Sequence, residues 1–288
     1  MSLGRVGVWL GTIGALPAAE ERSAVRELEA AGYGTIWFGE TPFSKEALSH
    51  AALILDATER VTVATGIASI WLRSPSSAAS GAATLAEAHP GRFVLGLGVS
   101  HAPIVTSIGH DYTKPLTRMR EYLDAMDASR YTAAPPAEPA PRVLAALAPK
   151  MLELARDRAQ GAHPYLVTPE HTVRARAILG VGRLLAPEQA FVLEPDPVRA
   201  RTVARDHLEV YLTLPNYAEN WRRSGFDDAD LADGGSDRLV DALVVWGDES
   251  AVRERVEEHF AAGADHVALQ ALGKNPVGQL TRLAPALR

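Results

Sequence analysis

The chain has 288 residues, of which 47% are hydrophobic and 22% charged, and its formal net charge is −6 at pH 7. It contains no cysteine, which excludes disulfides, thiolate metal sites and cysteine nucleophiles and suits a reducing cytosol. The acidic balance disfavours nucleic acid and anionic membranes as partners, but local amides or cations could still hold an anionic small molecule.

The beginning of the sequence shows no targeting pattern. A basic segment followed by a cleavable apolar stretch is missing, and no run reaches the roughly 18 apolar residues that a membrane span needs. We therefore expect a cytoplasmic protein that does not enter the membrane.

Short β-branched runs alternate with longer helical patterns along the whole chain. The predicted strands are almost continuously apolar, as in a parallel sheet covered by helices, and they span Arg5–Leu10, Thr35–Gly39, Val61–Ile67, Phe93–Gly98, Arg142–Leu147, His163–Val167, Gln189–Glu194 and His266–Gln270. The predicted helices span Ala18–Ala31, Ser76–Ala88, Pro115–Ala128, Lys150–Gln160, Pro169–Leu179, Pro197–Tyr211 and Asp248–Ala262. Eight such units favour an α/β fold, a (β/α)8 TIM barrel in which residues 1–288 form one domain.

Two segments interrupt this alternation. Tyr131–Pro141 is rich in proline and alanine, which predicts an extended connector within the domain. Leu214–Gly247 is an insertion before the last strand, with helical patterns at Asn216–Ser224 and Ser236–Val244. Insertions of this kind often cover the active-site mouth of a barrel.

In a TIM barrel the functional residues gather where the strands end. Most residues at the predicted strand ends are small or apolar, and they include Trp9, Leu10, Gly11, Gly66, Ile67, Ile70, Trp71, Gly96, Gly98 and Leu147. A slot with small apolar walls and few polar groups suits a flat aromatic ring better than a sugar or a metal complex.

Polar residues follow the second and fourth predicted strands. Glu40 stands in WFGETPF, where it could hydrogen-bond a ligand or simply open a loop as a solvated acid. Ser100 and His101 follow two glycines in GRFVLGLGVSH, which is not the dinucleotide-binding fingerprint because its third glycine is missing. His101 could exchange a proton near neutral pH, or it could cap a loop.

The fifth and sixth strands contribute further candidates. Leu147, Ala148, Pro149 and Lys150 lead into a helix whose free N–H groups could bind phosphate, although an ordinary turn fits equally well. His163 and Tyr165 share one face of the sixth predicted strand, which is either the barrel interior or the helix layer.

Two other kinds of site are disfavoured. Glu40, His101, His163 and Glu194 could converge on a divalent ion, but the sequence has no H-x-H or H-E-x-x-H pair, so no metal site is predicted. The G-x-S-x-G motif of serine hydrolases is also missing.

On these residues the chain resembles the luciferase-like monooxygenase superfamily, and within it the F420-dependent oxidoreductases. The resemblance covers nearly the whole length and depends on the order and spacing of its pieces. These are GVWLG, GYGTIWFGE, RVTVATGIASIWLRSP, HPGRFVLGLGVSH, KPLTRMREYLDAM, PRVLAALAPKMLELARDRAQGAHPYLVTPEHT and AGADHVALQ.

The resemblance implies a homodimeric barrel that holds coenzyme F420, or alternatively FMN, at the carboxyl ends of its strands. It places Glu40 against the cofactor ring, a cis peptide bond between Gly66 and Ile67 behind the ring, and the cofactor phosphate at Leu147, Ala148 and Pro149. Gly98, Ser100 and Lys150 complete the predicted cofactor site, and the predicted substrate pocket consists of Trp9, Thr41, Trp71 and Tyr165.

The sequence also departs from the pattern of its relatives. F420-dependent sugar-phosphate dehydrogenases have histidine and glutamate where this chain has Thr41 and Val99, so we do not expect oxidation of sugar phosphates. The phosphate-binding turn, usually glycine-rich, reads Leu-Ala-Pro here.

The leading interpretation is hydride transfer between F420 and a small organic substrate. Glu40 would position the ring, and His101 or His163 would handle the substrate proton. An FMNH2-dependent luciferase-like monooxygenase and a non-catalytic barrel that binds a flavin-type molecule are the alternatives.

Overall fold

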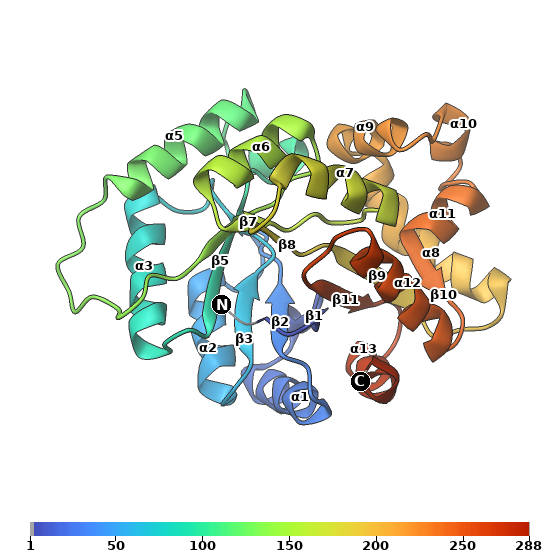
Figure 1. The fold of residues 1–288 in the computed structure, drawn as a ribbon, viewed down its shortest axis with the longest axis horizontal. Coiled ribbons are helices and arrows are strands. Elements are labelled where there is room, and N and C mark those ends of the chain that lie inside the picture. The colour runs from blue at the N-terminus through green and yellow to red at the C-terminus, as the bar shows by residue number, and fades with distance from the viewer. Residues whose placement is uncertain (1–2, 288) are drawn as a thin grey trace.

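The computed structural model describes residues 3–287, so residues 1, 2 and 288 of the predicted single domain lie outside the described range. Parallel strands occupy the centre of the molecule and helices surround them (Figure 1). The strands are β1 (Val6–Trp9), β2 (Thr35–Phe38), β3 (Thr62–Thr65), β4 (Ala68–Ser69), β5 (Phe93–Gly98), β6 (Arg142–Leu144), β7 (Gly161–Ala162), β8 (Leu184–Leu185), β9 (Glu188–Val192), β10 (Val244–Trp246) and β11 (Val267–Ala271).

Most helices follow a strand and lie on the outside of the sheet. The α-helices are α1 (Ala18–Ala31), α2 (Ala47–Ala57), α3 (Pro75–Ala88), α4 (Ala102–Ser107), α5 (Pro115–Asp127), α6 (Pro149–Arg158), α7 (Pro169–Leu179), α8 (Pro197–Leu212), α9 (Pro215–Arg223), α10 (Asp228–Leu231), α11 (Asp237–Leu243), α12 (Glu249–Ala261) and α13 (Pro276–Leu283). Two 3-10 helices, η1 (Ile13–Ala15) and η2 (Ala284–Leu287), complete the described chain. Within residues 3–287, no helix has both the length and the apolar character to cross a membrane.

The strands curl into the predicted α/β barrel. They pair in the order β10-β9-β11-β1-β2-β3-β5-β6-β7-β8, and β4 pairs with β5. β8 and β9 are two parts of one strand: the amides of Ala186 and Glu188 donate to carbonyls at 162 and 164, while the Pro187 carbonyl accepts from Ala268. Because this strand bonds to neighbours on both sides, it connects the two ends of the sheet.

Local sequence explains why several helices begin where they do. Proline occupies the first turn of α3, α7 and α8, where its missing N–H costs nothing. The side chains of Ser74, Thr168 and Asp196 accept hydrogen bonds from the first amides of these three helices. As a result, the predicted starts of α7 and α8 agree with the structure.

The predicted sixth strand, His163–Val167, is wrong. β7 ends at Ala162, and residues 163–167 form an irregular loop. Pro164 has no N–H to donate to a neighbouring strand, and Leu166 has a left-handed φ of 51°. Both features take the chain out of the sheet.

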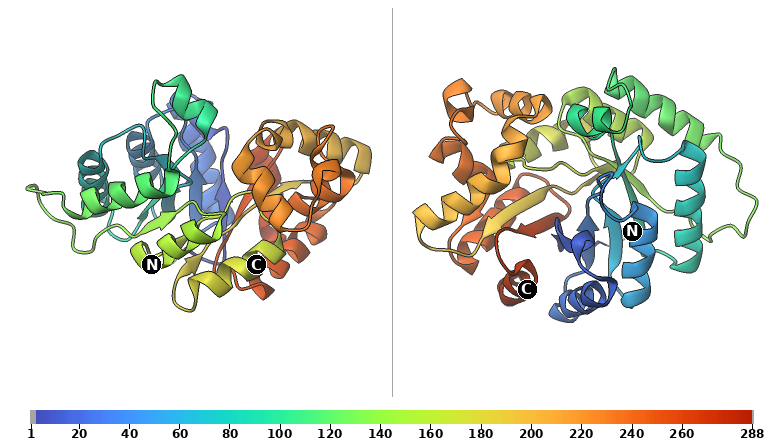
Figure 2. Two further views of the ribbon diagram at one scale, coloured as in Figure 1. Left: turned by 90° about the horizontal axis from the view of Figure 1, so that it is seen from above. Right: turned by 180° about the vertical axis from the view of Figure 1, so that it is seen from behind.

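Other differences concern elements that the pattern did not predict. The third predicted strand, Val61–Ile67, ends at Thr65 in β3. The elements that were not expected are β4, β8, β10, α2, α4, α10 and α13. The predicted helix at Ser236–Val244 instead ends at Leu243, where β10 begins. The insertion forms α9, α10 and α11 beside α8, and the predicted connector 131–141 loops away from the barrel (Figure 2).

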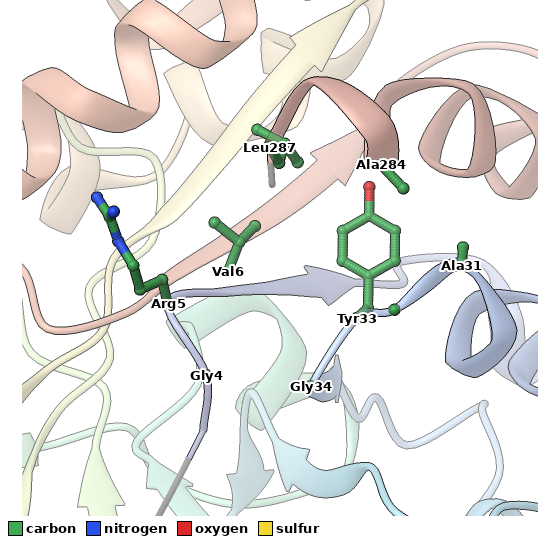
Figure 3. A pocket seen from close by; sticks show the side chains of 9 residues that line it. Gly4, Arg5, Val6, Ala31, Tyr33, Gly34, Ala284 and Leu287 are labelled. Atoms are coloured by element: carbon green, nitrogen blue, oxygen red, sulfur yellow. The ribbon is translucent and has the colours of Figure 1, made fainter.

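A shallow hollow of about 210 Å³ lies at the amino ends of β1 and β2, next to η2 (Figure 3). Gly4, Val6, Tyr33 and Leu287 are among the residues that line it. Ligands of barrel enzymes bind at the opposite end, where the strands finish. The candidate site is therefore sought at that other end.

Candidate active site

The structure brings the ends of β1, β3 and β5 into close contact. A Cβ atom on Gly66 would lie 2.7 Å from Trp9 Nε1, and one on Gly98 would lie 2.4 Å from the Ile67 side chain. Such distances leave no room for a larger residue. Trp9, Gly66, Ile67 and Gly98, all predicted from the sequence, therefore meet at one place on the rim.

The peptide bond between Gly66 and Ile67 is cis, as the resemblance implies. Gly66 and Ile67 are half-buried, between the fully buried strands β3 and β4. This segment therefore lies at the rim where β3 ends, with the Ile67 side chain packed against Gly98 of β5.

Glu40 lies directly beside this segment. Its Oε2 accepts a hydrogen bond of 2.9 Å from the Ser69 amide, and its Oε1 accepts one of 2.9 Å from the Ala47 amide. Arg73 forms an ion pair with the same carboxylate, and the side chains of Glu40 and Arg73 are 2% and 5% exposed. The described contacts of Glu40 are thus with β4, with the first residue of α2 and with Arg73, and its contact with a cofactor ring stays a prediction.

Thr41 and Trp71 lie near the same rim. Thr41 is exposed, and its hydroxyl accepts a hydrogen bond of 3.4 Å from the Phe43 amide. Trp71 is half-buried and donates its indole N–H to the Val99 carbonyl at 2.8 Å. Both stay predicted members of a substrate pocket.

The segment after β5 has an unusual backbone. Ser100 adopts a left-handed φ of 55°, and its carbonyl accepts a hydrogen bond of 3.2 Å from the Tyr112 hydroxyl. Such strain costs about 1 to 3 kcal/mol and concentrates at functional sites. The strained turn therefore supports a binding role for this part of the rim.

His101 begins α4 at the end of this turn, and its ring centroid lies 5.6 Å from that of Tyr217 on α9. Its Nδ1 is buried and has no hydrogen-bond partner in residues 3–287. Burial lowers the pKa of His101, while the Asn216 side chain opposes this. His101 is consequently a neutral imidazole whose buried Nδ1 is unpaired within residues 3–287, and Tyr217 of α9 lies against its ring.

His163 faces the barrel interior. It is 1% exposed and stacks on Trp37, with a centroid distance of 4.2 Å and an angle of 12°. Its Nδ1 donates to the Ala186 carbonyl at 2.7 Å, so Nε2 carries the lone pair. Burial lowers the pKa of His163 to about 4, and a Cβ on Gly66 would lie 2.9 Å from Nε2. His163 thus supports Gly66 from inside, and its predicted role in proton transfer stays a prediction.

The predicted phosphate turn is held by a histidine on the next helix. His171 Nε2 donates to the Leu147 carbonyl at 3.0 Å. Because the C=O and N–H of a trans peptide point in opposite directions, the Ala148 N–H points away from His171. Ala148 precedes Pro149 at the start of α6, and no side chain caps this helix. Within residues 3–287 the Ala148 amide therefore has no partner, and the exposed Lys150 lies beside it.

Tyr165 belongs to a hydrogen-bond network that was not predicted. Its hydroxyl donates to Gln270 Oε1 at 2.8 Å and accepts from the Tyr211 hydroxyl at 3.2 Å. It also lies 3.3 Å from His207 Nε2, and its ring centroid is 5.0 Å from that of Trp9. Tyr165 and Trp9, both predicted pocket residues, are therefore neighbours.

Glu188 was also missed, because the predicted strand began one residue later. It is 1% exposed, and its Oε2 accepts a hydrogen bond of 3.0 Å from the Leu166 amide. Its Oε1 has no partner within residues 3–287, and burial raises its pKa to about 8. A glutamate at the start of an apolar strand was the available sequence signal.

The candidate metal ligands do not form a site in the described chain. Among residues 3–287, no three histidine, aspartate or glutamate side chains are grouped to hold a metal ion. Glu194 instead pairs with Arg199 at 2.9 Å.

Comparisons with known proteins agree with this geometry. The family model of the luciferase-like monooxygenases matches residues 1–266. A putative coenzyme F420-dependent oxidoreductase of Mycobacterium tuberculosis is 35% identical over 121 residues, which are 42% of this chain and 35% of that protein. The match therefore spans only about a third of the mycobacterial protein. A 5,10-methylenetetrahydromethanopterin reductase of Methanolobus tindarius is 22% identical over 87% of this chain and 88% of its own length.

Solved structures share the fold. The F420-dependent tetrahydromethanopterin reductase of Methanopyrus kandleri superposes with a TM-score of 0.80 at 16% identity, over 99% of both chains. An F420-dependent secondary alcohol dehydrogenase, solved with an F420-acetone adduct, gives a TM-score of 0.79 at 15% identity, also over 99% of both chains. With the family model matched over most of its length, this chain belongs to the luciferase-like monooxygenase family.

Proposed function

We propose that this protein is an F420-dependent oxidoreductase that transfers a hydride between the deazaflavin and a small organic substrate. The observation that carries the proposal is the rim itself. The half-buried segment at Gly66 and Ile67, packed against Gly98, lies on the same rim as a turn whose Ala148 amide has no partner among residues 3–287. Closely packed small and apolar residues beside an unpaired amide suit an aromatic ring system that carries a phosphate.

Glu40 would position the ring indirectly, through its hydrogen bond to Ser69 of β4, and the other predicted residues would act as follows. Gly66, Ile67, Gly98 and Ser100 would lie against the ring, and residues 147–150 would hold the phosphate. F420, when bound, supplies a carbon that accepts or donates a hydride. Trp9, Thr41, Trp71 and Tyr165 would contact the substrate and help to exclude water.

His101 is the candidate for moving the substrate proton. Its buried Nδ1 has no partner among residues 3–287, and its lowered pKa keeps it neutral, so it could accept a proton at neutral pH. His163 is less suited, because its ring is stacked on Trp37 behind Gly66.

Titration of the purified protein with F420 and with FMN tests the proposal. Quenching of tryptophan fluorescence should report a micromolar or lower dissociation constant for F420, since Trp9 and Trp71 lie at the rim. A Lys150→Ala variant should bind F420 more weakly, while Arg156→Ala, at an exposed position in the last turn of the same helix, serves as the control. Binding of FMN without binding of F420 would overturn the proposal.

A reduced-flavin monooxygenase is the second candidate, and the cover that Tyr217 and α9 form over His101 favours it. Protecting an oxygen adduct from water needs such a cover. Substrate-dependent oxygen consumption with FMNH2, but none with F420H2, would support this alternative.

The homodimer and the cytoplasmic location also remain predictions, and sedimentation analysis of the purified protein would test whether it is a homodimer.

A further inference from the structure

We propose that Glu188, which is hydrogen-bonded to the loop that carries Tyr165, positions Tyr165 and through it the side-chain amide of Gln270, which offers hydrogen-bond donors to a carbonyl oxygen of the ligand. This inference rests on the proposed function only for the identity of that ligand. Glu188 is a positioning residue, since it contacts the loop that carries Tyr165 and does not itself reach the mouth.

Glu188 holds the loop at the residues on either side of Tyr165. Its amide donates to the Pro164 carbonyl at 2.8 Å, and its Oε2 accepts from the Leu166 amide at 3.0 Å. The Leu166 carbonyl accepts a further hydrogen bond of 3.1 Å from Trp221 Nε1. The left-handed φ of 51° at Leu166 is unfavourable for leucine, and it persists because these bonds fix both sides of the residue.

The surroundings of Glu188 favour its uncharged form. The titratable groups that interact with it are hydroxyls: Tyr165 of the loop, Tyr211 of α8 and Tyr217 of α9. No lysine, arginine or histidine of residues 3–287 forms an ion pair with it. Burial accordingly raises its pKa to about 8, and ionisation above that pH would place an uncompensated charge against the loop.

Tyr165 in turn holds the side chain of Gln270 through a hydrogen bond. Its single hydroxyl proton goes to Gln270 Oε1, so Tyr211 and His207 must act as donors to the Tyr165 oxygen. With Oε1 engaged, the Gln270 NH2 group points the other way, and a Cβ on Gly11 would lie 3.0 Å from Nε2. Gly11 follows β1 at the rim, so the amide hydrogens of Gln270, which have no partner within residues 3–287, face the mouth.

The first test needs no cofactor. Protein labelled with 13C at the tyrosine ring carbon that bears the hydroxyl is titrated by NMR from pH 6 to 9.5, and Tyr165→Phe assigns the signal. The wild-type Tyr165 signal should shift with a midpoint near pH 8, and Glu188→Gln, which keeps the shape and the Oε acceptor, should abolish that shift. Glu153→Gln, at an exposed carboxylate on α6, should titrate like wild type.

The second test measures the dissociation constants of F420 and FMN at pH 6 and pH 9.5. The wild-type protein should lose at least fivefold more affinity than Glu188→Gln between these pH values. Titration of the probe itself affects both proteins equally and therefore does not contribute to this difference. Gln270→Leu should bind both probes about tenfold more weakly at pH 6, as expected for one lost hydrogen bond.

The outcomes separate this proposal from the proposed function. A Tyr165 signal that does not titrate near pH 8, or that titrates equally in Glu188→Gln, would overturn the positioning role whatever the protein binds. If neither probe binds but the NMR shift follows Glu188, the assignment of the cofactor fails and the positioning role stands. Unchanged affinity in Gln270→Leu, where a probe does bind wild type, would overturn the donor role of Gln270.

Discussion

Two buried carboxylates, Glu40 beside β4 and Glu188 at the start of β9, stabilise the rim in opposite ways. Glu40 has an arginine and two backbone amides around it, so its charge is compensated inside the protein. Glu188 has one backbone amide and three tyrosines, and burial raises its pKa to about 8. One side of the rim is thus held by an ion pair, and the other by a neutral acid that pH can ionise.

The comparison shows why a buried acid need not have the same role at each position. Removing a charge from water costs several kcal/mol unless an interaction with a partner inside the protein compensates this free energy. Around Glu40 the partner is built in, because Arg73 and two backbone amides surround the carboxylate. At Glu188 protonation avoids the desolvation free energy of a charge, so a rise in pH that ionises this side chain should affect the Tyr165 loop.

Removing the partner of Glu40 should have the largest effect. We expect Arg73→Met to lower the free energy of unfolding by about 3 to 5 kcal/mol, because it leaves a buried charge uncompensated. Urea denaturation at pH 7 measures this change. The double variant Glu40→Gln/Arg73→Met should recover much of the loss, and Arg156→Met, at an exposed ion pair, should change little. A single variant as stable as wild type would show that the ion pair is not needed.

The pH dependence of stability should differ between wild type and Glu188→Gln. The folded-state pKa of Glu188 is raised from 4.5 to about 8, so folding binds a proton between these values. The wild-type protein should therefore lose stability relative to the variant as pH rises through this range, by up to about 1.4 kcal/mol per pH unit. Thermal denaturation at pH 5, 6, 7 and 8 tests this, and parallel curves for the two proteins would contradict it.

Filling the space at Gly66 should have an intermediate effect. A Cβ there would collide with Trp9 and His163, so Gly66→Ala should cost about 1 to 3 kcal/mol of stability. Urea denaturation with Gly14→Ala as the control gives the comparison, since a Cβ on Gly14 would meet only His50, at 3.4 Å. Equal stability of the two variants would mean that the contact around Gly66 is looser than described.

Releasing the phosphate turn should have the smallest effect. His171→Leu removes the hydrogen bond to the Leu147 carbonyl, which is worth about 1 kcal/mol, so F420 should bind roughly fivefold more weakly. Fluorescence titration measures the affinity, and Val173→Ala, at a position 55% exposed on the same helix, should leave it unchanged. If His171→Leu binds F420 as wild type does, the turn does not depend on this bond.

Local chemistry explains the parts that could be predicted. Apolar runs and first-turn prolines marked most strands and helices, since strand burial and proline geometry act over a few residues. The meeting of Trp9, Gly66, Ile67 and Gly98 could also be expected, because the ends of parallel strands lie on one rim. The loop at 163–167 could not be predicted, because its apolar residues follow the pattern of a strand. Pro164 and the left-handed backbone of Leu166 take the chain out of the sheet there.

The sequence by itself determined the α/β barrel, its family and the residues that stand at its strand ends. Only the tertiary structure decided what those residues touch: Arg73 against Glu40, His171 against the Leu147 carbonyl, and Gln270 against Tyr165. These pairs lie 33, 24 and 105 residues apart, beyond the reach of any helical or strand period. Burial is equally a property of the assembled barrel, and it is burial that turns Glu188 into a neutral acid.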